Sequence, residues 1–286
     1  MNSESEKPKR IAIQGGYGAF HEIAANKYFK DNNIEIVPRN TFKDLFSALQ
    51  TGKVDYGITA IENSLAGRIL PNYTLLLESK MKIIGEVFLR IKQNLVALPG
   101  QKIEEIKEVY SHPMAILQCQ HYFEDFPHIK LIDSIDTALS AKQIAENKLW
   151  GIGAIASELA AKKYQLSIIA EEIETHKINY TRFLILEDKN GGGFDDRQVN
   201  KSSLSFALAH KIGSLSKILS IFSYYDINLS KIQSMPIIGH DWEYQFYVDL
   251  EFDNYDMYRQ SVKAVEPFTS NVCILGEYYK GEVFID

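Results

Sequence analysis

Short apolar runs alternate with helical patterns over the first two thirds of the chain. The runs Arg10–Gln14 (RIAIQ), 34–38 (IEIVP) and Tyr56–Ile61 (YGITAI) are typical of buried strands, and residues with helical spacing follow each of them. A strand followed by a helix, repeated several times, predicts an α/β fold built on parallel sheets with helices on both faces.

The spacing between elements changes after Lys82 and then returns to the earlier pattern. Two longer strands fill Lys82–Gly100, after which strand and helix alternate again up to the strand Asn179–Leu186 (NYTRFLIL). We expect a first domain, 1–187, with two α/β lobes: lobe 1 at about 8–86 plus 178–187, and lobe 2 at about 87–177. A cleft between two such lobes is the natural ligand site.

A second, smaller domain follows a glycine-rich stretch. Residues 188–201 are charged, contain three consecutive glycines and lack periodicity, which is typical of a linker. Residues 202–286 then read strand, helix, strand, strand, helix, strand. This βαββαβ order predicts a ferredoxin-like domain.

Composition excludes several classes of protein. The 286 residues carry 31 Lys plus Arg against 37 Asp plus Glu, a net charge of −6, and no basic patch argues for nucleic acid as a partner. No apolar run approaches the roughly 20 residues of a membrane helix. The polar start MNSESEKPKR has no apolar signal core, and two cysteines cannot build a disulfide framework, so we expect a cytoplasmic protein.

Small polar residues follow several predicted strands, where ligands bind in parallel sheets. The turn GGYGAFHE starts a helix whose free N–H groups suit a carboxylate, although a plain tight turn is the favoured interpretation. It lacks the GxGxxG pattern with a following acidic residue, which disfavours a dinucleotide site. Glu62, Asn63 and Ser64 form either a ligand site or a helix cap.

Other candidates occur further along. We expect His112 to be a helix cap or a satisfied structural histidine rather than a metal ligand, and Thr137 to cap a helix. Cys119 is expected to be a small buried residue, and Gln118 to point into the core or a cleft. Arg182, next to Thr181, either holds a carboxylate or is an ordinary surface arginine. With hardly any His–Asp pair or carboxylate dyad in view, the set favours binding a dianion and assisting an elimination over hydrolysis or metal chemistry.

These segments carry a family resemblance. Read in order, GGYGAFHEIAA, IENSLAGRI, SHPMAILQC, DTALSA, GAIAS and NYTRF resemble the signatures of prephenate dehydratases and the plant-type arogenate dehydratases. IGSLSKIL and KIQSMP resemble the ACT regulatory domain that follows them. The resemblance covers roughly Arg10 to Tyr279 and implies a periplasmic-binding-protein-like catalytic domain followed by an ACT domain.

The resemblance implies decarboxylative dehydration of prephenate to phenylpyruvate in phenylalanine biosynthesis. The enzyme must hold two carboxylates and help hydroxide leave. No electron sink is required, so neither a cofactor nor a metal is implied. In the family the essential threonine corresponds to Thr181, which we expect to donate to the leaving hydroxyl. Asn63 and Gln118 supply neutral donors, and Glu62 orients the site or supplies a proton.

The resemblance also implies binding residues. Candidate substrate contacts are Gly18, Ala19, Phe20, His21, Ser64, Thr137, Arg182 and Phe183. Candidate contacts for phenylalanine as a feedback effector are Gly213, Ser214, Leu215, Asn228, Gln233, Ser234, Met235 and Pro236. Pairing of ACT domains implies a homodimer or homotetramer.

Three positions depart from the family pattern. His21 replaces the usual serine; it either faces the cleft and titrates near neutrality or caps the helix. Gln233 and Met235 replace the Glu and Arg of the family's Glu-Ser-Arg-Pro segment, which leaves the response to phenylalanine open.

Two alternatives remain open at this point. The substrate could be arogenate, which carries an amino group in place of the keto oxygen. The chain could also be a non-enzymatic amino-acid sensor, since two lobes around a cleft suit a binding protein.

Overall fold

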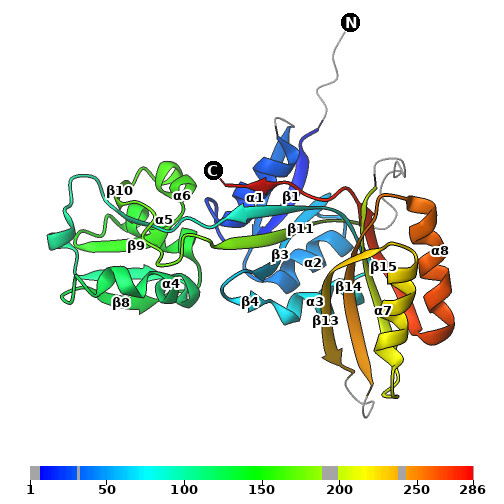
Figure 1. Cartoon of the computed structure of the whole chain (residues 1–286). Helices are drawn as coiled ribbons and strands as arrows, with labels where there is room; N and C mark the ends of the chain where they lie inside the picture. Colours follow the sequence, from blue (N-terminus) through cyan, green and yellow to red (C-terminus); the bar gives the residue numbers. More distant parts are fainter. Residues whose placement is uncertain (1–6, 31–32, 189–198, 238–242, 286) are drawn as a thin grey trace, which may run out of the picture. The chain divides into compact units, whose positions relative to one another are not determined.

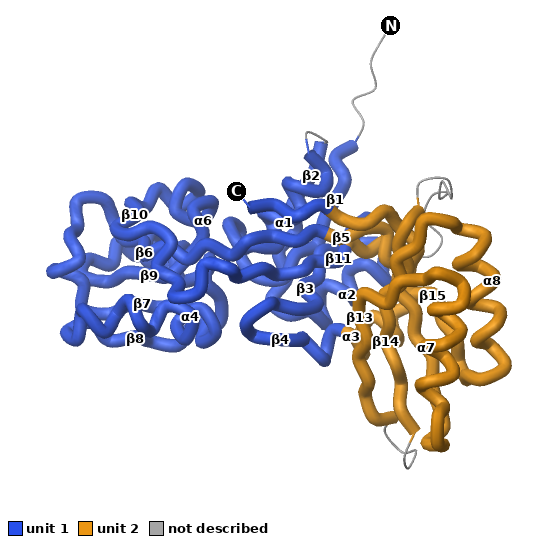
Figure 2. The backbone as a smooth tube through the Cα atoms, in the orientation of Figure 1, with its two compact units in different colours: residues 1–72, 87–184, 282–286 blue, residues 73–86, 185–281 orange. Residues whose placement is uncertain are grey.

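The computed structural model describes residues 7–30, 33–188, 199–237 and 243–285. It divides into two compact units, which Figure 2 distinguishes by colour: residues 1–72, 87–184 and 282–286 form the first, and residues 73–86 and 185–281 form the second. The first unit contains strands of two separate sheets, and the second contains a further set of strands with its own helices.

The first sheet of unit 1 is mixed: β1 pairs parallel with β2 and β3, whereas the end of β3 meets the start of β11, so β11 runs in the opposite direction. Its strands stand in the order β11, β3, β1, β2, with β4 paired antiparallel to β3 and β16 paired parallel to the end of β5. The elements of this part are β1 (Lys9–Gln14), α1 (Phe20–Phe29), β2 (Ile34–Arg39), α2 (Phe42–Gln50), β3 (Tyr56–Asn63), β4 (Gly67–Arg68), α3 (Leu70–Glu78), β5 (Met81–Arg90), β11 (Tyr180–Asp188) and β16 (Val283–Phe284). Helix α3 and strands β5 and β11 also extend into unit 2.

Sequence explains how α2 and its sheet come together. Thr41 caps α2 by accepting a hydrogen bond from the N–H of Asp44. The buried Leu45 and Leu49, four residues apart, lie on one face. A Cβ at Gly57 in β3 would come within 2.6 Å of Leu49, so glycine lets the helix pack closely on the sheet.

The second sheet of unit 1 has the order β10, β6, β9, β7, β8. Its elements are β6 (Asn94–Ala97), η1 (Ile103–Glu105), β7 (Glu108–Ser111), α4 (Pro113–Phe123), β8 (Lys130–Asp133), α5 (Thr137–Asn147), β9 (Ile152–Ala156), α6 (Glu158–Lys163) and β10 (Ser167–Ala170). Successive side chains of β6 point to opposite faces of this sheet. Val96 packs with α5 and α6 on one face, whereas its neighbours Leu95 and Ala97 pack with α4 on the other face.

Two chain segments connect the sheets of unit 1. Residues 91–93 lead from β5 to β6, and residues 171–179 return from β10 to β11. The N–H of Ile91 donates to the carbonyl of Asn179 at 2.7 Å, and the N–H of Ile173 donates to the carbonyl of Gln93 at 2.7 Å. The two connecting segments are therefore held side by side, as a chain that crosses twice requires.

Unit 2 has the βαββαβ order that the sequence predicted. Its elements are β12 (Lys201–Leu208), α7 (Ser214–Tyr224), β13 (Asn228–Pro236), β14 (Tyr244–Glu251), α8 (Tyr255–Val265), η3 (Glu266–Phe268) and β15 (Ser270–Tyr278). The strands stand in the antiparallel order β13, β14, β12, β15, and α7 and α8 lie on the same side of them (Figure 1). One buried core contains Ile218 and Phe222 of α7, Tyr258 and Val262 of α8, and Phe206 of β12.

The predicted α/β class and the two lobes of the first domain are confirmed, but the prediction of parallel sheets is wrong, because β6 pairs antiparallel with both β9 and β10. The predicted linker 188–201 overlaps Asp188 in β11 and Lys201 in β12, and its residues 189–198 lie outside the described part. The domain boundaries themselves stay a prediction.

Candidate active site

The end of β3 fixes the side chain of Asn63. Its Oδ1 accepts hydrogen bonds from the N–H groups of Leu65 at 3.0 Å and Ala66 at 2.8 Å, which closes a turn before β4. Because an amide oxygen cannot donate, the Asn63 NH₂ group must face the other way, toward β11.

Residues just before and at the start of β11 receive that group. The Asn63 Nδ2 lies 2.9 Å from Thr181 Oγ1, 2.7 Å from Asn179 Oδ1 and 3.2 Å from the carbonyl oxygen of Tyr180. Ser64 strengthens the junction, since its Oγ accepts from the Tyr180 N–H at 2.9 Å and its N–H donates to the Tyr180 carbonyl. The motifs IENS and NYTRF, 118 residues apart at Asn63 and Thr181, form one site.

Gln118 joins the site from α4. Its Oε1 accepts from Asn179 Nδ2 at 3.0 Å and from Gln93 Nε2 at 3.3 Å. Asn179 is fully buried and links Asn63 to Gln118. The structure thus brings together Thr181, Asn63 and Gln118, and adds Asn179 and Gln93, which the sequence interpretation missed.

Arg182 is buried and paired, contrary to a surface arginine. It is 4% exposed, its Nη1 lies 3.6 Å from Glu62 Oε1, and its guanidinium carbon lies 5.7 Å from the centre of the Phe88 ring. Alternation along β11 puts the Arg182 side chain on the face opposite to Thr181. Glu62 and Arg182 therefore form an ion pair beside the site.

The GGYG turn is packed against helices of the second sheet. The Gly18 N–H donates to Glu22 Oε2 at 2.6 Å, and the Gly18 carbonyl accepts from Ser157 Oγ at 2.6 Å. Gly18 has φ +87°, and a Cβ there would lie 2.6 Å from the Ala160 Cα. At least the Gly18 N–H is already occupied by a carboxylate of the protein itself.

Phe20 lies apart from the Thr181 contacts. It contributes to a cavity of about 510 Å³ between α1, α6 and the connecting segments, together with Ile23, Leu89, Leu159 and Ile168.

His21 is buried between aromatic rings. Its ring lies 4.9 Å from that of Phe183 and 5.6 Å from that of Phe42, and within the described chain its Nε2 has no hydrogen-bond partner. Burial lowers its pKa to about 3, so the expectation of a group titrating near neutrality is wrong. The cap prediction is also wrong, because Ala19 is the N-cap of α1.

Predictions for the second lobe had mixed outcomes. His112 caps α4 by accepting from the Met114 N–H, Pro113 follows it, and Cys119 is buried, all as expected. Thr137 is not a cap: Asp136 caps α5 through the Leu139 N–H at 2.8 Å. Burial raises the pKa of Asp136, whose Oδ1 also accepts from the Gly16 N–H at 3.4 Å.

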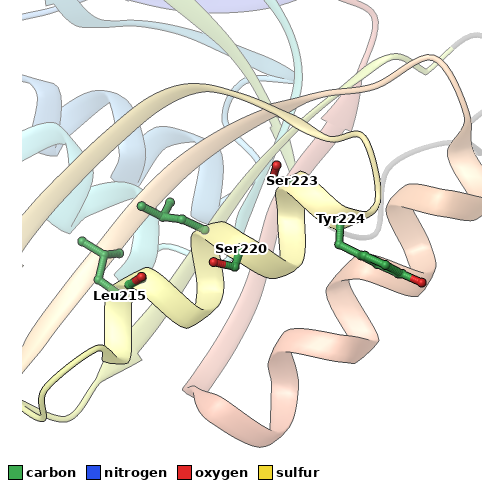
Figure 3. Close-up of a pocket in the computed structure, with 6 residues that line it drawn as sticks. Leu215, Ser220, Ser223 and Tyr224 are labelled. Carbon is green, nitrogen blue, oxygen red and sulfur yellow. The ribbon is translucent and has the colours of Figure 1, made fainter.

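The residues proposed to bind phenylalanine form two groups in unit 2. Gly213, with φ +76°, precedes α7, which begins at Ser214 and Leu215. The second group, Asn228 and 233–236, lies in β13. Among described residues, no hydrogen bond joins the two groups. Leu215 borders a shallow hollow on α7, with Ser220, Ser223 and Tyr224 along the same helix (Figure 3).

Two further features concern the described ranges, clusters of metal-ligating side chains and membrane-spanning helices. No three His, Cys, Asp or Glu side chains there are grouped so that they could hold a metal ion. Likewise, none of the helices in this part of the chain is long and apolar enough to cross a membrane.

Fold and site together define a two-lobed α/β protein with neutral hydrogen-bonding groups where its two sheets are connected. A family model described as prephenate dehydratase matches residues 11–191. An Arabidopsis thaliana protein, arogenate dehydratase/prephenate dehydratase 2, chloroplastic, is 38% identical over 280 residues, covering 94% of this chain and 72% of that protein.

Two solved structures are similar along nearly the whole chain. The prephenate dehydratase of Staphylococcus aureus has a TM-score of 0.80 and 26% identity, covering 94% of this chain and 99% of that one. GqqA, described as a novel type of quorum quenching acylase, has a TM-score of 0.85 and 27% identity, covering 95% and 98%. The chain belongs to the prephenate dehydratase family, which confirms the predicted family of the catalytic domain and the predicted enzyme class, a lyase of phenylalanine biosynthesis.

Proposed function

We propose that this enzyme converts prephenate to phenylpyruvate. Carbon dioxide leaves the ring carbon, its bonding electrons move through the ring, and the opposite hydroxyl departs. That hydroxyl takes up one proton, so the products are phenylpyruvate, carbon dioxide and water. The catalytic demand is a proton or hydrogen bond at the departing oxygen.

One contact carries this proposal: Asn63 donates to Thr181 Oγ1. The threonine oxygen accepts this bond, and within the described chain its own hydrogen has no acceptor. Thr181 is thereby set as a donor, which is what a departing hydroxyl needs. Its proton must be replaced from the solvent or from substrate after each turnover.

Apolar side chains adjacent in sequence to the site suit the substrate ring. Three apolar side chains are exposed, by 42% at Leu65, 61% at Leu117 and 78% at Ile178. Leu65 lies in the turn that follows Asn63, Leu117 directly precedes Gln118, and Ile178 directly precedes Asn179. Exposed aliphatic groups near a polar site gain by covering a carbon ring.

An acylase, as GqqA is described, fits this site less well. Such an enzyme needs a base beside its nucleophile. In the part of the chain that the structure describes, Thr181 Oγ1 contacts the amide of Asn63, which is not a base.

The test is an assay of purified protein with prephenate and, separately, arogenate, following phenylpyruvate and phenylalanine. We expect phenylpyruvate from prephenate. Greater turnover of arogenate would establish the alternative, and turnover of neither would contradict the lyase proposal. The observed contacts favour neither substrate.

We propose further that the βαββαβ unit acts as an ACT domain, through which phenylalanine inhibits the enzyme. We also propose that these domains pair into a dimer or tetramer. The enzyme is proposed to be cytoplasmic. Gly213 supports the first point, because its positive φ and the open space around its Cβ position leave the backbone accessible at the start of α7. Calorimetry with phenylalanine showing no heat, together with uninhibited turnover, would contradict it.

A further inference from the structure

Four side-chain amides form a continuous row beside Thr181. Gln93, Gln118, Asn179 and Asn63, here called the amide row, are joined in that order by hydrogen bonds of 3.3, 3.0 and 2.7 Å. The row runs from the connecting segments and α4 to the end of β3. An amide has a donor end and an acceptor end, so such a row has a direction.

Backbone groups fix that direction at Asn63. The N–H groups of Leu65 and Ala66 can only donate, so they hold Asn63 Oδ1 and turn its NH₂ group to Asn179 and Thr181. Asn179 must then accept with Oδ1 and donate with Nδ2. Gln118 must in turn accept with Oε1.

The direction of the amide row leaves the Gln118 NH₂ group without a hydrogen-bond partner among the described residues. Gln118 Oε1 already accepts two bonds, and Gln118 Nε2 makes no hydrogen bond to any described residue. Gln118 is half-buried, so this NH₂ group is available to a ligand. The row leaves available donors on both sides, the Thr181 hydroxyl and the Gln118 NH₂ group.

We propose that Asn179 is a positioning residue that turns the Gln118 NH₂ group toward a substrate carboxylate. The proposal rests on the lyase function above and extends it to the binding of the dianion. Asn179 itself does not touch the substrate, since it is fully buried and both of its polar atoms are engaged within the row.

The decisive variant is Asn179→Asp, which keeps size and changes direction. A carboxylate accepts from Asn63 but cannot donate to Gln118, so Gln118 turns its NH₂ group inward and presents its oxygen to the substrate. Gln93 turns with it and offers its Oε1, which has no partner among the described residues, as the acceptor. When protonated, the introduced carboxyl group has one acceptor and one donor, as the amide of Asn179 has, and it restores the original order. The charged groups around the row, Glu62 with Arg182 and Glu174 with Arg90, are unchanged in this variant.

The measurement is kcat/KM for prephenate from pH 5 to pH 9, as the ratio of Asn179→Asp to unaltered enzyme after subtraction of the uncatalysed rate. We expect the ratio to fall roughly ten- to hundredfold as pH rises, the effect of losing a hydrogen bond to a charged group, with KM carrying most of it. A ratio that is flat with pH overturns the proposal. Inactive unaltered enzyme would instead contradict the proposed function.

A second variant covers the case in which Asn179→Asp does not fold. Gln118→Glu still accepts from Asn179 and Gln93 but replaces the free NH₂ group by a charged oxygen. We expect the KM of Gln118→Glu to rise at least tenfold. The KM of Gln118→Met, which introduces no charge, should rise less. A KM for Gln118→Glu within about twofold of the unaltered enzyme overturns the proposal.

Discussion

At the scale of single residues, the hydroxyl of Thr181 is the group that the proposed reaction depends on. Thr181→Val keeps the shape and removes the hydroxyl, and Asn63 Nδ2 retains Asn179 and the Tyr180 carbonyl as acceptors. We expect kcat to fall by about 10²- to 10⁴-fold, the usual contribution of a positioned proton donor, with a smaller change in KM. Steady-state kinetics measures it.

Thr181→Ser is the matched control, because it keeps a hydroxyl at the same place. It should retain activity within about tenfold of the unaltered enzyme. If the valine variant does so as well, Thr181 has no part in the departure of the hydroxyl.

His21 predicts a pH dependence of stability. Its pKa is about 3 in the folded protein and about 6.5 in an unfolded chain, so the unfolded state binds more protons between these values. Stability should therefore fall as the pH drops below about 6.5, by up to about 1.4 kcal/mol per pH unit. Urea unfolding at pH 7.0, 6.0 and 5.0 measures this slope.

His21→Leu removes the titrating ring and keeps an apolar side chain between Phe42 and Phe183. The slope between pH 7.0 and 5.0 should become shallower by the amount that His21 supplies. Equal slopes in the two proteins would show that His21 is not held neutral.

Sequence reasoning at this scale found residues whose chemistry stands out. Thr181, Asn63 and Gln118 were predicted by resemblance, and the structure places them in one network. Asn179 was missed although it stands two positions before Thr181, because its partners lie 116 and 61 residues away. Burial of His21 was missed for the same reason, since Phe183 is remote in sequence.

At the scale of elements, the GGYG turn determines how α1 meets α6. Gly18→Ala combines a left-handed backbone with a Cβ 2.6 Å from the Ala160 Cα. We expect a loss of about 1–3 kcal/mol in unfolding free energy and a lower kcat/KM, because the turn also bonds to Ser157. Chemical unfolding and kinetics check this.

Gly52→Ala is the control that separates backbone strain at a positive φ from the steric clash of an added Cβ. Gly52 also has a positive φ, +64°, but no atom lies within 4 Å of its Cβ position. It should lose less stability than Gly18→Ala and keep full activity. Similar losses in both variants would assign the effect to backbone strain alone.

Which segments form strands and which form helices could be predicted from the sequence, because the spacing of apolar residues and the capping residues are local signals. The cap of α4 at His112 was recognised in this way. Thr137 was taken as the cap in place of Asp136, since both residues cap well and only the hydrogen bond to Leu139 distinguishes them.

At the scale of the whole molecule, a buried ion network stabilises unit 2. Lys201 Nζ lies 2.9 Å from Glu86 Oε1 and 3.4 Å from Glu251 Oε1, and both Lys201 and Glu86 are buried. Lys201→Met removes a cation from beside a buried carboxylate. We expect a loss of about 3–5 kcal/mol in unfolding free energy, measured by urea titration.

Lys280→Met is the control on the same network. Lys280 pairs with Glu251 at 2.8 Å, but its side chain is 51% exposed. Its loss should cost less than about 1 kcal/mol. An equal cost for both lysines would mean that burial does not set the value of these ion pairs.

The end of the chain returns to unit 1 after passing through unit 2. Val283 and Phe284 in β16 pair with Phe88 and Leu89 of β5, and Lys27 lies over the Phe284 ring at 5.2 Å. Deleting this terminal strand, or fusing a reporter to it, would consequently disturb the catalytic half first. A circular permutation that opens the chain elsewhere is the safer route for attaching a probe.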